Sequence, residues 1–135
     1  MRFSGWRAAL VIRHFLALIA TDRPATIAAL SARVGSIGDN RLGGWTGYRA
    51  SKAALNQIIR TFSIELGRSH PRLTLAGFHP GTVDSRLSAP FQRSVPAGQL
   101  FDAAGSAERL LTVIDALTPD DSGGCFDWAG ERIAP

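Results

Sequence analysis

The sequence predicts an α/β fold in which helices flank a parallel β-sheet. Segments with helical and with strand-like hydrophobic patterns alternate along the chain, and this alternation is typical of a parallel sheet. The strand-like segments are short apolar runs, as expected for strands covered on both faces. A length of 135 residues, with 45% apolar and 19% charged residues, fits one globular domain.

The first half of the chain predicts a helix, a strand, a long loop and a second helix. Apolar residues cover the segment 6–20 broadly, which indicates a helix buried on more than one side. Residues 26–30 form a short apolar run and predict a buried strand. Residues 31–47 are rich in Gly, Ser, Asp and Asn and predict a loop of a length that is usually functional. Residues 48–66 carry apolar residues at three- and four-residue spacing, so we expect a helix that stops at Gly67.

The second half continues the alternation. Residues 73–78 predict a second apolar strand, and residues 83–98, with two prolines, predict an irregular or partly helical flap. A third helix is expected over residues 107–117, starting near Ser106. Residues 125–128 predict a short final strand. Ligands of such sheets bind beyond the carboxyl ends of the strands, where the loops after the first two strands lie.

Tyr48 and Lys52 are the most informative pair in the sequence. The chain holds one Tyr and one Lys, and the two lie four residues apart at the start of a predicted helix. Residues at that spacing share a helix face, and an ammonium close to a phenol lowers the phenol pKa. Such a pair suits proton exchange with an alcohol or carbonyl oxygen. The alternative is a surface Tyr and Lys, but the preceding Gly/Ser loop at the ligand edge favours function.

Composition excludes several other classes of function. The net charge is +4, yet the 14 Arg are dispersed, so we expect no nucleic-acid partner. The longest apolar stretch is interrupted by charge and too short to cross a bilayer, so we expect no membrane association. A single cysteine, Cys125, excludes an internal disulfide framework, and the three His lack ligand spacing, so we expect no metal site. These features favour a cytoplasmic protein.

Five segments resemble the short-chain dehydrogenase/reductase family, in its C-factor-like and sniffer-like carbonyl reductase branch. Residues 48–56 read Tyr-Arg-Ala-Ser-Lys-Ala-Ala-Leu-Asn, and together with residues 31–40 and 43–45 they resemble the active-site block of that family. Residues 79–84 resemble its P-G-x-V segment, and residues 122–128 resemble its last strand. The resemblance implies a Rossmann-like doubly wound parallel sheet, of which residues 1–135 are the C-terminal portion. The N-terminal half, with its Gly-rich cofactor loop, would be missing.

The resemblance also implies roles for particular residues. Tyr48 would be the general acid/base, and Lys52 would bind the nicotinamide ribose and lower the Tyr48 pKa. The cofactor would be NADP or NAD, and the substrate a small carbonyl compound or secondary alcohol. The segment that would lie against the nicotinamide is Pro80, Gly81, Thr82 and Val83.

The family's catalytic serine has no direct counterpart. The equivalent position holds Ala32, flanked by Ser31 and Ser36. Ser36 could supply the hydroxyl that holds the substrate, or it could instead cap a turn beside Gly35. Ser31 is expected at the strand end, near the cofactor.

Two functional hypotheses follow from this reading. The first is an NAD(P)-dependent oxidoreductase portion that transfers hydride between the cofactor and a carbonyl or alcohol. The second is a catalytically inactive truncated paralogue that acts as a dimerisation, binding or C-factor-like signalling module. Homo-oligomers would form through the helices at 6–20 and 48–66, where Leu55, Ile59 and Phe62 are either interface or core residues.

Overall fold

The structure confirms the predicted α/β fold. A computed structural model describes residues 4–86 and 88–135 of the chain. Three strands, β1 (Ala25–Leu30), β2 (Leu73–His79) and β5 (Cys125–Asp127), form a parallel sheet in the order β1-β2-β5. The carboxyl ends of the three strands therefore share one edge, which is where parallel sheets of this kind bind their ligands.

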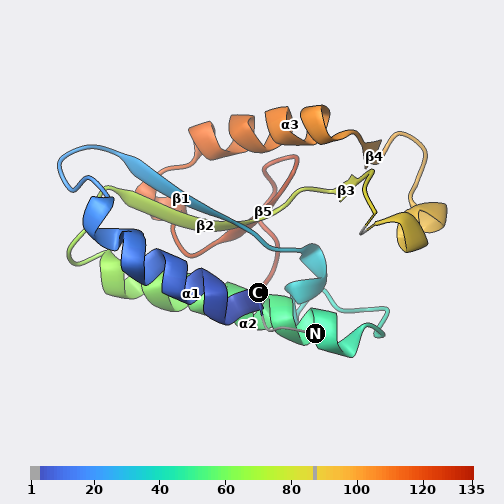
Figure 1. The fold of residues 1–135 in the computed structure, drawn as a ribbon, viewed down its shortest axis with the longest axis horizontal. Helices are drawn as coiled ribbons and strands as arrows, with labels where there is room; N and C mark the ends of the chain where they lie inside the picture. Colours follow the sequence, from blue (N-terminus) through green and yellow to red (C-terminus); the bar gives the residue numbers. More distant parts are fainter. Residues whose placement is uncertain (1–3, 87) are drawn as a thin grey trace.

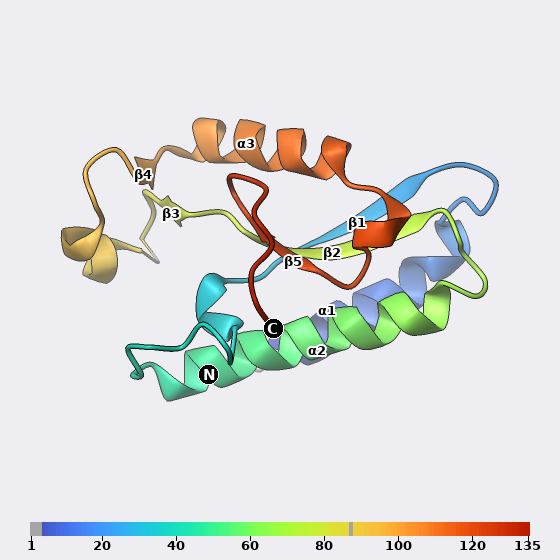
Figure 2. The same cartoon turned by 180° about the vertical axis from the view of Figure 1, so that it is seen from behind.

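Three helices cover the sheet on its two faces. Helices α1 (Ser4–Phe15) and α2 (Thr46–Leu66) lie side by side below the sheet in Figure 1, and α3 (Ala103–Ala116) lies above it. The view from behind shows the same three layers (Figure 2). No helix within residues 4–86 and 88–135 is both long enough and apolar enough to cross a bilayer.

The central strand β2 is buried on both faces and joins two hydrophobic clusters. Leu73 and Leu75 pack with residues of α1 and α2, among them Ile12 and Ile59. The alternating side chains of β2 point to opposite faces, so Ala76 and Phe78 pack instead with α3 and β5. The members of the second cluster are Ala76, Phe78, Val113 and Phe126. The strand thus anchors the helices that carry the candidate site.

The expectation that the first strand is buried was wrong. Burial alternates along β1, and Leu30 at its end is 63% exposed. Among the described residues β1 pairs with β2 alone, and α1 and α2 cover one of its faces. The side chains of the other face are therefore exposed, and β1 is an edge strand here.

The flap after β2 is partly helical, as expected, and also contains two short strands. Strand β3 (Thr82–Val83) pairs in parallel with β4 (Leu100–Phe101), and a 3₁₀ helix, η3, covers Ala89–Ser94 between them. The sequence did not predict β4, because two residues are too few to form a pattern. Residue 87 of this flap lies outside the described residues.

Several helix boundaries differ from the sequence prediction, most of all the start of α3 and the end of α1; α2 begins at Thr46, two residues earlier than expected. Helix α3 begins at Ala103 rather than near Ser106, because the Asp102 side chain accepts a hydrogen bond from the backbone N–H of Gly105 and caps the helix. Helix α1 ends at Phe15 and continues as a short 3₁₀ helix, η1 (Leu16–Leu18), rather than as α-helix to residue 20.

Candidate active site

Tyr48 and Lys52 lie in the first turns of α2, at the carboxyl end of β1. The Lys52 ammonium donates a hydrogen bond to the carbonyl oxygen of Leu30, with an N–O distance of 2.9 Å. The same nitrogen lies 5.8 Å from the centre of the Tyr48 ring. Both side chains are half-buried. The structure therefore brings the two groups together where parallel sheets bind their ligands.

The pKa shifts at this pair follow burial rather than mutual attraction. Burial lowers the pKa of Lys52, and the nearby Cys125 opposes that shift. Burial also raises the pKa of Tyr48. The sequence predicted the opposite direction for Tyr48. In the structure the ammonium is bound to the Leu30 carbonyl, and burial alone sets the direction of the Tyr48 shift.

Ser31 lies directly after β1 and is buried. Its hydroxyl donates a short hydrogen bond to Oδ1 of Asn56, which lies one turn beyond Lys52 on α2. Burial raises the pKa of the Cys125 thiol at the start of β5, and the Ser31 hydroxyl opposes that shift. Sequence reasoning did not single out Asn56, although it lies within the quoted block.

Ser36 is also buried, and its hydroxyl is engaged within its own loop. The oxygen accepts a hydrogen bond from the backbone N–H of Asp39 at 2.9 Å. The hydroxyl donates a longer one, 3.4 Å, to the carbonyl oxygen of Pro135. These contacts are those of the turn-capping alternative. Ala32, at the family's serine position, is buried as well.

The segment from Pro80 to Val83 is fixed by contacts from α3, from β4 and from the residue that follows β5. Ser106 donates a hydrogen bond to the carbonyl oxygen of Pro80 at 3.0 Å. Gly81 has a φ of 75° and packs against Phe101 and Trp128, whose rings meet edge-on with centres 5.0 Å apart. The rigid placement of this segment could not be read from the sequence, since Phe101 and Trp128 are far apart along the chain.

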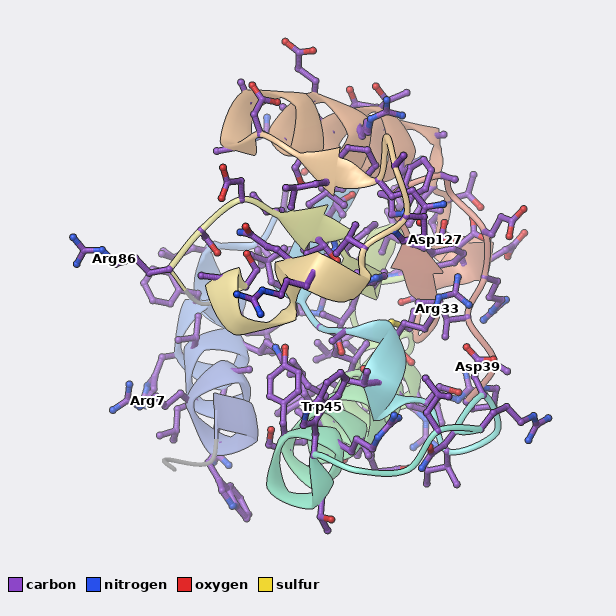
Figure 3. The ribbon with its side chains drawn as sticks, turned by 90° about the vertical axis from the view of Figure 1, so that its right-hand side faces the viewer. Arg7, Arg33, Asp39, Trp45, Arg86 and Asp127 are labelled. Atoms are coloured by element: carbon purple, nitrogen blue, oxygen red, sulfur yellow. The ribbon has the colours of Figure 1, made fainter. Side chains whose placement is uncertain are left out.

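An ion-pair network ties the loop after β1 to the end of β5. Arg33 lies between Asp127 and Asp39, with N–O distances of 2.7 and 3.1 Å (Figure 3). Asp127 is buried, and its other oxygen accepts backbone N–H bonds from Ala129 and Glu131. The network fixes the start of the loop that carries Ser31 and Ser36, and the sequence prediction missed it because its members are distant in the chain.

His79 lies beside this network, at the end of β2 and opposite Asp127 in the sheet. Burial lowers the pKa of His79 to about 4, and Arg33 acts in the same direction while Asp127 opposes both. Within the part of the chain that the structure describes, no three His, Cys, Asp or Glu residues are grouped to hold a metal ion.

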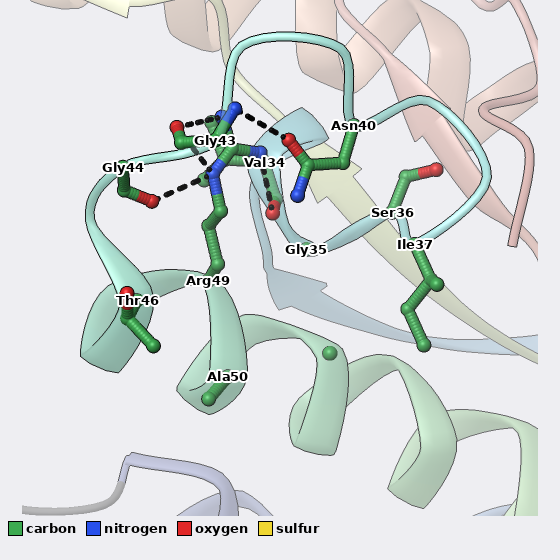
Figure 4. Close-up of a pocket in the computed structure, with 11 residues that line it drawn as sticks. Val34, Gly35, Ser36, Ile37, Asn40, Gly43, Gly44, Thr46, Arg49 and Ala50 are labelled. Atoms are coloured by element: carbon green, nitrogen blue, oxygen red, sulfur yellow. Dashed lines mark hydrogen bonds between the residues drawn. The ribbon is translucent and has the colours of Figure 1, made fainter.

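A hollow of about 370 Å³ lies between the 34–44 loop and α2 (Figure 4). The Arg49 guanidinium closes one side and donates hydrogen bonds to the carbonyl oxygens of Val34, Gly43 and Gly44. The chain enters α2 through Trp45, whose φ of 47° is unusual for a residue with a side chain. Arg49 lines the hollow, whereas Tyr48 and Lys52 do not, so the hollow lies beside the Tyr48–Lys52 pair.

Comparison with curated proteins gives oxidoreductase and signalling relatives. No model of a known protein family matches the chain. The chain is 36% identical over 107 residues to the C-signal protein of Myxococcus xanthus, covering 79% of this chain and 59% of that protein. It is 35% identical over 99 residues to a 1-hydroxy-2-glutathionyl-2-methyl-3-butene dehydrogenase of Rhodococcus, covering 73% of this chain and 42% of that enzyme. The chain spans about half the length of the relatives it matches.

The solved structures that superpose on this chain include carbonyl reductases. The carbonyl reductase Sniffer of D. melanogaster superposes with a TM-score of 0.79 at 25% identity, over 94% of this chain and 52% of that one. An NADPH-bound carbonyl reductase from chicken fatty liver superposes with a TM-score of 0.80 at 28% identity, over 97% and 54%. Fold and comparisons thus define a carbonyl-reductase-like α/β protein. The chain belongs to the short-chain dehydrogenase/reductase family.

Proposed function

We propose that this chain provides the nicotinamide and substrate side of an NAD(P)-dependent oxidoreductase that acts on a carbonyl compound or a secondary alcohol. The observation that carries the proposal is the Tyr48–Lys52 pair at the carboxyl end of β1, with the Lys52 ammonium beside the Tyr48 ring. The similarity to an NADPH-bound carbonyl reductase supports the choice of cofactor class.

The residues present fit the nicotinamide half of such a cofactor. Lys52 carries three N–H donors, and its hydrogen bond to Leu30 uses one, which leaves donors for ribose hydroxyls. Pro80 and Gly81 are held firmly and would form the wall against the nicotinamide, with Thr82 and Val83 following in β3. When bound, the cofactor supplies or accepts the hydride. The sequence contains no G-x-x-x-G-x-G pattern, so we assign no residue to the pyrophosphate.

Tyr48 would exchange the proton at the substrate oxygen. Its raised pKa keeps the hydroxyl protonated at neutral pH, which is the form that donates to a carbonyl oxygen during reduction. Lys52 would hold Tyr48 in place, because its ammonium lies beside the Tyr48 ring, and would bind the ribose with its remaining N–H donors. The Ser36 hydroxyl would give up its long hydrogen bond to Pro135 and donate to the substrate oxygen instead. Ser31 would lie beside the cofactor.

Cofactor binding by the 135-residue chain tests the proposal. NADPH and NADH are titrated by fluorescence against the chain and against the Tyr48→Phe and Lys52→Ala variants. Arg68→Ala is the control, because it removes one positive charge from the exposed turn after α2. We expect saturable binding that Lys52→Ala weakens and Arg68→Ala does not. Equal binding by Lys52→Ala and the unaltered chain would contradict the proposed role of the pair.

A second candidate function is association with another protein, including a second copy of the chain. Helix α1 exposes several large apolar side chains; these are Trp6, Leu10, Val11 and Phe15. Leu55 and Ile59, by contrast, are buried in the core between α1, α2 and the sheet, and Phe62 is half-buried against that core. A signalling role of this kind rests on the similarity to C-signal. Sedimentation velocity measures the oligomeric state over a wide range of protein concentrations. A sedimentation coefficient that stays at the monomer value would exclude self-association.

A further inference from the structure

A second hollow, of about 400 Å³, adjoins the first and shares the lining residues Gly35, Ile37 and Ala53 with it. One wall is α2, from Ala53 to Arg60, and the opposite wall is the segment 132–135 after β5. The beginning of β5, with Cys125, forms a third side. The hollow is thus at the β5 side of the sheet, two strands away from the β1 edge. Neither Tyr48 nor Lys52 lines it.

The charged side chains around this hollow are positive and have no acidic side-chain partner. Arg60 and Arg132 are its charged lining residues, and no Asp or Glu lines it. Every salt bridge among the described residues involves Arg33, so neither Arg60 nor Arg132 has an acidic partner there. The Arg132 guanidinium lies over the ring of Phe126, 5.7 Å from its centre, and this contact holds it beside the hollow. In the 135-residue chain the terminal carboxylate of Pro135 also lines the hollow, and one Pro135 oxygen accepts hydrogen bonds from Gly38 and Ser36. Two guanidinium groups against one carboxylate leave a net positive charge, which favours an anion.

The remaining lining combines an amide with apolar surface. Asn56 uses its Oδ1 to accept the hydrogen bond from Ser31, so its amide N–H groups point away from Ser31 and add donors. Ile37, Ala53 and Ile133 supply apolar surface, and Ile37 is 79% exposed at the rim. A purely inorganic ion would leave that surface in water, whereas an aliphatic chain would cover it.

We propose that this hollow binds a small organic anion, with its charged group between Arg60 and Arg132 and its apolar part on Ile37, Ala53 and Ile133. The site is separate from the proposed cofactor site. Its test measures binding alone, so it can succeed or fail independently of any reductase activity.

Binding is measured by ¹H–¹⁵N NMR titration of the 135-residue chain with hexanoate and with hexyl phosphate. 1-Hexanol is the uncharged control, because it keeps the apolar part. The variants are Arg60→Gln and Arg132→Gln, and Arg68→Gln is the charge-matched control outside the hollow. All three arginines are exposed, so the variants should keep the fold, which circular dichroism checks.

We expect saturable shifts of amide signals at Asn56, Arg60 and Ile133 with at least one of the two anions. Each hollow variant should weaken that binding about tenfold, as loss of one charge-assisted contact does, and Arg68→Gln should leave it unchanged. 1-Hexanol should bind at least about tenfold more weakly. Absence of saturable binding by both anions overturns the proposal. So does equal weakening by Arg68→Gln, or equally tight binding of 1-hexanol.

Discussion

Substitution of Gly81 by alanine tests how the candidate nicotinamide wall is held in place. Gly81 has a φ of 75°, in the left-handed region that residues with a Cβ rarely adopt. A Cβ at this position would lie 2.6 Å from one ring carbon of Phe101 and 3.0 Å from a ring carbon of Trp128. Those distances are well inside van der Waals contact, so the aromatic pair or the segment from Pro80 to Val83 must move.

The free-energy cost of Gly81→Ala has a backbone part and a packing part, and the Gly98→Ala variant measures the backbone part alone. Gly98 has a φ of 80°, but an added Cβ would meet nothing within 4 Å. Gly98→Ala therefore has the left-handed backbone cost of about 1–2 kcal/mol, reduced by about 0.4–1 kcal/mol from the stiffer unfolded chain. Gly81→Ala adds an overpacking cost of about 1–3 kcal/mol. We expect Gly81→Ala to be the more destabilising by that second amount.

Urea unfolding followed by far-UV circular dichroism gives the free energy of unfolding for each variant. Fluorescence of Trp128, read in variants in which Trp6 and Trp45 are Phe, reports separately whether the aromatic pair has moved. Equal destabilisation by Gly81→Ala and Gly98→Ala would refute the reasoning, because it would mean that the Phe101–Trp128 pair adapts at no cost.

Three further predictions concern the loops around the site. Asp127→Asn should lower the free energy of unfolding by about 2 kcal/mol, because it breaks the buried end of the Arg33 ion pair; Asp39→Asn, at the exposed end, should cost less than about 1 kcal/mol in the same urea titration. His79 is half-buried and has a folded pKa of about 4, below its ordinary 6.5, so the folded state disfavours its protonation. The free energy of unfolding should therefore be highest above pH 6.5 and should fall by up to about 3 kcal/mol as the pH falls toward 4. His79→Gln should flatten this dependence of the free energy of unfolding on pH. Arg49→Lys should speed proteolysis of the 40–45 loop, seen by mass spectrometry, because a lysine cannot bind three carbonyls at once; unchanged cleavage would contradict that role.

The sequence predicted the fold class and the helix that carries the Tyr48–Lys52 pair, because periodic apolar spacing over 21 residues is a strong signal. It misjudged β1, since a run of apolar residues does not reveal whether both faces of a strand are covered. It also missed the contact between Arg33 and Asp127. That pair joins residues 94 positions apart, and no local pattern encodes such a contact.

The site was predictable in its chemistry but not in its electrostatics. Residue types and spacing identified Tyr48 and Lys52, yet the direction of the Tyr48 pKa shift depends on burial, and the Lys52 ammonium donates its hydrogen bond to the Leu30 carbonyl oxygen. The hydrogen bonds of Ser36 likewise depend on where Pro135 lies, which is a property of the folded chain alone.

The register of the sheet has a consequence for how fast the protein folds. Ala25 pairs with Leu73 and Gly77 pairs with Cys125, a separation of 48 residues in both ladders. No hairpin joins β1, β2 and β5 to one another, so each of the two parallel ladders forms only after a long loop has lost its conformational freedom. Such non-local topology gives slow folding relative to helical proteins of the same size. During synthesis β2 has no partner on its β5 side until residues 125–127 have emerged, and until then its apolar residues need protection from aggregation.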